Sequence, residues 1–239
     1  MRTVWPSAAV IAVAALVTSA CFPSFADLQG GAPPVSDGSA GQGTCPGSQF
    51  CSAFDPPAAV LPFGWASSRG DPSGFVLVGA EGTSTPNALR LQAAESDVER
   101  WLVTTFGPSV SNVTFAFQLR VDALGGAKAS DVVVLRLGCV ATALDVKLKR
   151  TGRLQLQSGM IDTLQVSAPA PGFVGVSVAW DLAGGRATLV LGNDAPLMLT
   201  TVAGACPTPL MASFGMVDLG ATRSGTFDFR VDDVHASWK

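Results

Sequence analysis

The chain has 239 residues and a formal net charge of −3, with only 14% charged residues against 48% hydrophobic ones. Its 15 lysines and arginines are scattered along the chain, so the sequence shows no basic cluster that could bind a phosphate backbone. We therefore expect no nucleic-acid partner. Twenty-six glycines and 16 prolines indicate many turns, as an all-β fold requires.

Residues 1–20 have the features of a signal peptide. Met1 and Arg2 supply a positively charged start, and Ala8–Val17 is an unbroken run of ten apolar residues. A helix needs about 20 apolar residues to cross a bilayer, so this run is too short to span one but has the length of a signal-peptide core. We therefore expect an exported protein.

The next residues offer two processing sites. Thr18–Cys21 resembles the lipobox of bacterial lipoproteins, in which the cysteine becomes the lipidated N-terminus. Residues 21–44 are rich in Gly, Pro and Ser, as a flexible tether behind such a cysteine would be. We therefore predict lipid attachment at Cys21 and a place in the cell envelope, at the outer membrane or cell surface. Cleavage after Ala26 would instead release a secreted protein.

Cysteines provide a second sign of an oxidising compartment. Either processing route leaves four of the five cysteines, an even number that can form two disulfides. Four cysteines allow three pairings. We favour Cys45–Cys51, which is local, and Cys139–Cys206, which would join a strand to a loop.

From residue 45 to 239 the sequence predicts strands separated by turns. In Val113–Ala123 apolar and polar residues alternate, which places them on opposite faces of a half-buried strand. Val132–Leu137 is continuously apolar, as in a strand buried on both sides. Gly184–Gly185 predicts a two-residue hairpin turn. Further strands are expected around 89–91, 146–149, 153–157, 174–182, 186–191 and 227–232. The prediction is one all-β domain of two packed antiparallel sheets.

Three stretches of this domain resemble a known fold. Pro62–Trp65, the hairpin Val176–Asn193 and the terminal Phe227–Val234 are similar, in this order, to concanavalin A-like lectin and glucanase domains, including laminin-G-like domains. The resemblance implies a jelly-roll sandwich and a carbohydrate-binding role. It rests on structural motifs, so it indicates fold more than activity.

One acidic stretch resembles a catalytic motif. Glu95-Ser96-Asp97-Val98-Glu99 is similar to the motif of the laminarinase-like glycoside hydrolase family 16, which implies Glu95 as nucleophile, Asp97 as its modulator and Glu99 as acid/base. Retaining hydrolysis needs the two carboxyl groups about 5–5.5 Å apart. Ser96 stands where that family has Ile or Leu, and the stretch has the composition of a solvated loop. A retaining hydrolase is therefore the alternative function.

Binding candidates are fewer. Trp65 and Trp101 could stack on sugar rings, although tryptophan at strand spacing more often fills a core. We expect no cofactor. Calcium, which laminin-G-like domains often bind, would use loop aspartates such as Asp71, Asp194 and Asp218, although no ligand spacing selects them.

The sequence thus predicts a non-catalytic, envelope-displayed lipoprotein whose jelly-roll domain binds a glycan or another surface polymer. Its partners would be the membrane, through the lipid anchor, and a polysaccharide. A second alternative is a structural or adhesion protein without a small ligand.

Overall fold

The computed structural model describes most of the chain from residue 47 onward, all within one compact unit, residues 32–239. The described residues are 47–52, 54, 61, 64–70, 74–79, 87–93, 99–107, 109–124, 131–139, 142–149, 151–159, 161–167, 172–204, 206, 208–218 and 227–239. The predicted signal peptide, tether and lipid site lie outside them. None of the described segments is a helix long and apolar enough to cross a bilayer.

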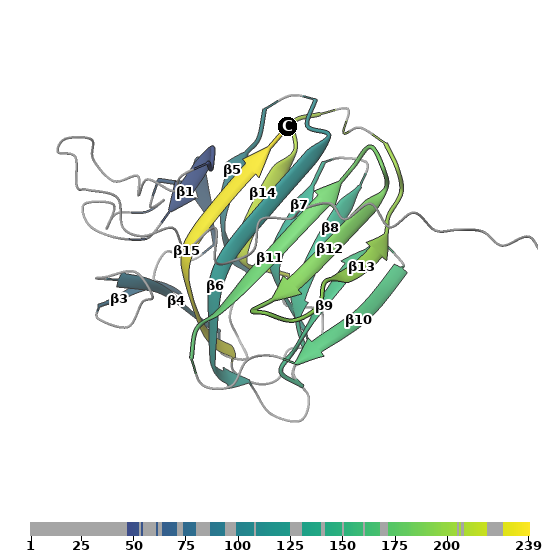
Figure 1. The fold of residues 1–239 in the computed structure, drawn as a ribbon. Helices are drawn as coiled ribbons and strands as arrows, with labels where there is room; N and C mark the ends of the chain where they lie inside the picture. Colours follow the sequence, from purple (N-terminus) through teal and green to yellow (C-terminus); the bar gives the residue numbers. More distant parts are fainter. Residues whose placement is uncertain are drawn as a thin grey trace, which may run out of the picture. The chain divides into compact units, whose positions relative to one another are not determined.

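The described strands form two antiparallel sheets, A and B, which are drawn in front and behind in Figure 1. Sheet A contains, in spatial order, β13 (Leu197–Thr200), β12 (Arg186–Leu191), β11 (Val174–Asp181), β6 (Asn112–Leu124), β15 (Phe227–Trp238), β4 (Asn87–Ala93) and β3 (Phe75–Gly79), with β1 (Phe50–Ser52) also paired to β15. Sheet B contains β10 (Ile161–Ser167), β9 (Arg153–Ser158), β8 (Ala143–Leu148), β7 (Val132–Gly138), β14 (Met211–Asp218), β5 (Arg100–Thr105) and β2 (Ser67–Arg69). The predicted all-β, two-sheet sandwich is confirmed.

The strands that the alternation of side chains predicts are present in the structure. In β6 the four residues Val113, Phe115, Phe117 and Leu119 are at most 1% exposed and point into the core. Strand β7 lies between β8 and β14 in sheet B and is buried along almost its whole length, as its apolar run predicts.

Strand β15 pairs with β6 along most of its length, from Phe227 opposite Leu124 to Trp238 opposite Val113. The register shifts between Asp232 and His235, where Asp233 has a positive φ of 47°. This bulge adds a residue to β15, so Val234 and Ala236 beyond it again face the core and are 0% exposed.

Aromatic side chains from both sheets meet in the core. Phe214 of sheet B stacks on Trp65, with ring centroids 5.6 Å apart and planes 4° from parallel. Its ring also meets Phe117 of sheet A edge-on at 4.9 Å and lies 5.6 Å from Phe115. These contacts tie sheet A to sheet B, because each large buried aromatic ring removes much apolar surface from water.

The hairpin between β11 and β12 differs from the sequence prediction. The turn contains four residues, Leu182–Gly185, closed by the pair Asp181 and Arg186. Asp181 Oδ1 accepts a hydrogen bond from the Gly184 backbone N–H at 2.8 Å, and Gly185 has a positive φ of 63°. An aspartate that bonds a backbone N–H in this way favours a longer turn than the Gly–Gly pair alone predicts.

Arg100 links sheet B to sheet A. It is the first residue of β5 in sheet B, it is only 4% exposed, and its Nη1 donates to the backbone oxygen of Gln92 in sheet A at 2.9 Å. The guanidinium occupies the space where a Cβ of residue 74 would be, so a larger residue at Gly74 would displace the Arg100 side chain.

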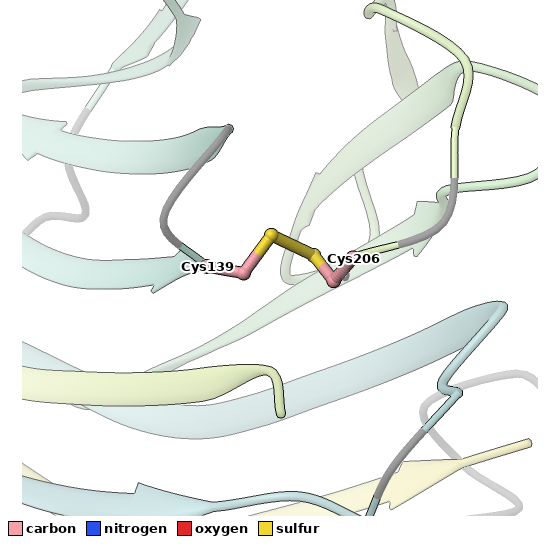
Figure 2. Close-up of a disulfide and its surroundings, with 2 residues drawn as sticks. All are labelled: Cys139 and Cys206. Carbon is pink, nitrogen blue, oxygen red and sulfur yellow. A yellow bond between two sulfur atoms is a disulfide. The ribbon is translucent and has the colours of Figure 1, made fainter. Parts of the chain in front are cut away.

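A disulfide joins Cys139, directly after β7, to Cys206 in the connection from β13 to β14 (Figure 2). Their Cα atoms are 5.9 Å apart, and 67 positions separate them in the sequence. This is the strand-to-loop pairing that the sequence favoured. Cys51 is disulfide-bonded as well. Cys45, its expected partner, lies outside the described residues.

We expect the Cys139→Ser/Cys206→Ser double variant to unfold more easily than wild type, by about 2–4 kcal/mol, because a cross-link over a long loop restricts the unfolded chain. Chemical denaturation of the two proteins under oxidising conditions measures the difference. In the presence of a reductant the two curves should converge; a gap that persists there would mean that the serines disturb packing and that the cross-link contributes little.

Candidate functional site

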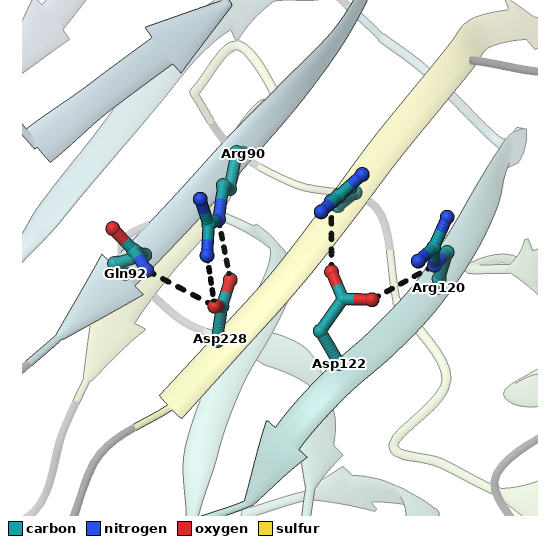
Figure 3. A network of polar contacts seen from close by, with 6 residues as sticks. Arg90, Gln92, Arg120, Asp122 and Asp228 are labelled. Atoms are coloured by element: carbon teal, nitrogen blue, oxygen red, sulfur yellow. Dashed lines mark hydrogen bonds and ion pairs between the residues drawn. The ribbon is translucent and has the colours of Figure 1, made fainter. Parts of the chain in front are cut away.

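The outer face of sheet A, turned away from the core, carries a group of charged and polar side chains on its three adjoining strands β4, β15 and β6 (Figure 3). We call this group the outer-face network; its members are Arg90, Gln92, Arg120, Asp122, Asp228 and Arg230. All six occupy polar positions of alternating strands, opposite the apolar residues that fill the core.

Asp228 on β15 is the centre of one half of the network. It accepts two hydrogen bonds from Arg90 on β4, from Nε to Oδ1 at 2.9 Å and from Nη2 to Oδ2 at 2.5 Å. A third comes from Gln92 Nε2 to Oδ2 at 3.0 Å. The bidentate pairing fixes the plane of the guanidinium and holds both partners in one geometry.

Asp122 on β6 is the centre of the other half. Its Oδ1 accepts from Arg120 Nε at 2.8 Å, and its Oδ2 lies 2.8 Å from Nε of Arg230. The Arg230 side chain is 10% exposed, whereas that of Arg120 is 34% exposed. One carboxylate thus holds two guanidinium groups on neighbouring strands, one nearly buried and one open to solvent.

The register of the sheet explains why the arginines come together. Arg230 on β15 lies directly opposite Arg90 on one side and Arg120 on the other. Neighbouring strands are about 4.8 Å apart, so three like charges would repel one another strongly without counter-charges. Asp228 and Asp122 supply them.

The contacts between Arg90, Gln92 and Asp228 also shift the pKa values of the Asp228 carboxyl group and the Arg90 guanidinium group. Burial disfavours the charged form of Asp228, but hydrogen bonds from Arg90 and Gln92, together with the charges of Arg90 and Arg120, outweigh it and lower the pKa of the carboxyl group. The pKa of Arg90 is raised, chiefly by its hydrogen bond to Asp228. Both groups are therefore ionised at neutral pH.

The two tryptophan candidates lie in different environments. Trp65 is 4% exposed and packs in the core against Phe214 and Phe50, so it has no face to offer a sugar ring. Trp101 lies in β5, where it is half-buried and opposite Gly215 on one side and Arg69 on the other. It belongs to sheet B, and so to the opposite face of the sandwich from the outer-face network.

Only one residue of the acidic motif can be placed. Glu95 and Asp97 lie outside the described residues. Glu99 precedes β5, so it lies at the end of the connection that crosses from sheet A to sheet B. Glu99 is not within a strand, and its separation from Glu95, which decides whether two carboxyl groups can act as a retaining pair, lies outside the described residues.

Metal-binding candidates gain no support. Asp71 is outside the described residues, and Asp194 is an exposed turn residue. Asp218 was expected in a loop but ends strand β14, where it pairs with Val133. Among the described residues no group of three or more His, Cys, Asp or Glu side chains is placed to hold a metal ion.

The sequence places the network residues on polar faces but does not single them out as a group. Arg90 and Asp228 are 138 positions apart, and neither strand carries a motif that names the other as its partner. Only the strand order brings them together. The signal present in the sequence was an arginine or aspartate at the outward position of each of three alternating strands.

Known proteins of similar structure identify the class of fold. No family model matches the chain, and no curated protein matches it. Solved structures do. Cellulose induced protein Cip1 matches with a TM-score of 0.58 at 11% identity, and a conserved carbohydrate esterase of Shiga toxin-encoding bacteriophage phi24B matches at 0.52 and 14%; each match covers 79% of this chain and 97% of the other. The polysaccharide lyase family 7 alginate lyase AlgAT5 matches at 0.51 and 10% identity, over 72% of this chain and 85% of that one.

At these identities the similarity concerns fold alone. Together with the two antiparallel sheets, it defines the described part of the chain as a jelly-roll β-sandwich of the concanavalin A-like kind. The sequence-based prediction of the fold class is confirmed.

We expect the Asp228→Asn variant to lose about 1 kcal/mol of stability at neutral pH, because a partly exposed charged pair is lost. The lowered pKa of Asp228 contributes stability that is present above its unfolded pKa of about 3.9 and is lost as the pH falls through the folded value. Denaturation midpoints of both proteins should therefore converge in acid. A gap that stayed constant down to pH 2 would contradict the ionic origin.

Proposed function

We infer that this protein is a non-catalytic glycan-binding protein of the cell envelope and that the outer-face network is its binding surface. The observation that carries the proposal is the fixed set of hydrogen-bond donors and acceptors on β4, β15 and β6. Sugar recognition needs such groups held in place before binding, because ordering flexible side chains costs affinity.

The position of the network supports this choice over Trp101. Strand β15 lies between β6 and β4 inside sheet A, and its partners fix it on both sides. Trp101 lies on β5, which pairs directly with the short edge strand β2. Val76 on β3 is 41% exposed and lies opposite Arg90 on β4. It adds an apolar surface beside the network on which the C–H face of a sugar could pack.

The structural comparisons are consistent with a carbohydrate ligand. The similar structures are those of a carbohydrate esterase, an alginate lyase and a cellulose-induced protein. What carries over to this chain is only the suitability of such a sandwich for displaying polar side chains to a glycan. Of the catalytic alternative through Glu95 and Glu99, the described part of the chain contains only Glu99, which lies outside the strands.

The envelope location rests on the N-terminal sequence. A signal peptide, a cysteine in a lipobox-like context and a Gly/Pro/Ser-rich tether would place the domain at the outer membrane or cell surface. The disulfide between Cys139 and Cys206 agrees with an oxidising compartment outside the cytoplasm.

We expect the Arg120→Gln variant of the domain to bind glycans about tenfold more weakly than wild type, because one charge-assisted donor is lost. Asp122 keeps Arg230 as a partner, so the fold should persist. A glycan array followed by calorimetry on the best-binding oligosaccharide measures the effect, with Arg153→Gln, an exposed arginine of sheet B, as the matched control.

The same assay locates the site. Binding that Arg120→Gln leaves intact and Trp101→Ala abolishes would move the site to sheet B. If no glycan binds the folded wild-type domain, the glycan-binding function itself is refuted and a structural or adhesive role takes its place.

We expect Cys21 to carry the lipid. Cells grown with a labelled fatty acid should yield a labelled wild-type protein and an unlabelled Cys21→Ala variant, because the thiol is the attachment point. Labelling of neither would indicate a secreted protein without an anchor, and equal labelling of both would place the lipid on a residue other than Cys21.

A further inference from the structure

The charges of the outer-face network nearly cancel. Its three arginines face two aspartates, which leaves a single excess positive charge over six side chains. Asp232, which is 0% exposed, adds another carboxyl group two residues from Arg230 on the same strand. The whole chain carries a net charge of −3. Long-range attraction of a polyanion is therefore weak.

The guanidinium groups are also already engaged. Nε of Arg90 donates to Asp228, Nε of Arg120 donates to Asp122, and Nε of Arg230 lies 2.8 Å from Asp122. A uronate or sulfate group binds arginine best through two parallel N–H donors. The edge that includes Nε is taken by an aspartate in all three arginines, and that aspartate would repel an incoming anion.

The hydroxyl groups of a neutral sugar, in contrast, are not repelled by the aspartates. A sugar diol both donates and accepts, so its oxygens can take the outward Nη–H groups of Arg90 and Arg120 while its protons bond the aspartate oxygens. An ion pair held in this geometry offers a donor and an acceptor side by side, and neither partner need be displaced.

We propose that the outer-face network selects neutral, hydroxyl-rich glycans over glycans that bear uronate or sulfate groups. This inference rests on the proposed function and names the class of ligand for the same site. Arg90 and Asp228 are the specificity-determining pair, because Asp228 closes the edge of Arg90 to acidic groups.

The test compares hexasaccharides of equal length: cellohexaose, laminarihexaose and mannohexaose against hexamers of mannuronate, of galacturonate and of a sulfated galactan. Wild type should bind at least one neutral hexasaccharide about tenfold more tightly than any acidic one. Its affinity should change less than about twofold between roughly 50 and 500 mM NaCl, because no net charge is neutralised on binding.

The Asp228→Asn variant should reverse the preference. It opens Arg90 and adds a net positive charge, so acidic hexamers should gain about tenfold in affinity while neutral ones lose affinity. Asp145→Asn is the matched control, because Asp145 pairs with Arg136 through the same two-point geometry in sheet B. It changes the net charge equally and should leave both affinities as in wild type.

Two results would overturn the inference. Tighter binding of acidic hexamers by wild type, weakening as salt rises, would show that the network accepts anions and would leave the glycan-binding function standing. Binding of none of the oligosaccharides, and of no glycan on the array, by a protein that melts as expected would remove the glycan-binding function, and the ligand class with it.

Discussion

The ladder between β6 and β15 is the contact on which both faces of sheet A depend. Its register places Phe115, Phe117 and Leu119 in the core. The same register places Arg120 directly opposite Arg230 on the outer face of the sheet. A slip of one residue would bury the charges and expose the apolar side chains, so hydrophobic burial fixes the geometry of the polar face as well. Core packing thus sets where the charges lie, and the aspartates then hold them there.

The bulge at Asp233 extends this relationship along the strand. Because it adds one residue, β15 keeps its apolar side chains inward on both sides of the shift. The strand pairs with β4 before the bulge and with β1 after it. The outer-face network lies wholly in the first part, where three strands run side by side and a second register shift, between Asp228 and Phe229, leaves Asp122 between two residue pairs. Such a surface suits a fixed arrangement of donors and acceptors.

Local periodicity makes the strands predictable from the sequence. The outer-face network is not predictable in this way, because its residues are far apart along the chain. Alternation in β6 and β15 and the apolar run of β7 follow from which face each residue must bury. No local pattern could show that Arg90 would pair with Asp228, since that pair depends on the order of strands. The sequence offers Trp65 as a binding candidate because the residue that stacks on it, Phe214, is far away along the chain. The hydrogen bond from Gly184 N–H to Asp181 likewise gives a longer turn than the Gly184–Gly185 pair alone predicts.

The attachment of β1 has a mechanical consequence. This strand joins sheet A through three residue pairs with β15, and a backbone hydrogen bond from Gln49 to Ala236 extends the contact. A pull on the chain preceding Phe50 therefore reaches sheet A through a ladder of three residue pairs, whereas β15 is held to β6 along most of its length. Under load β1 would peel away first. The core strands would stay paired, and the network surface on them would keep its shape.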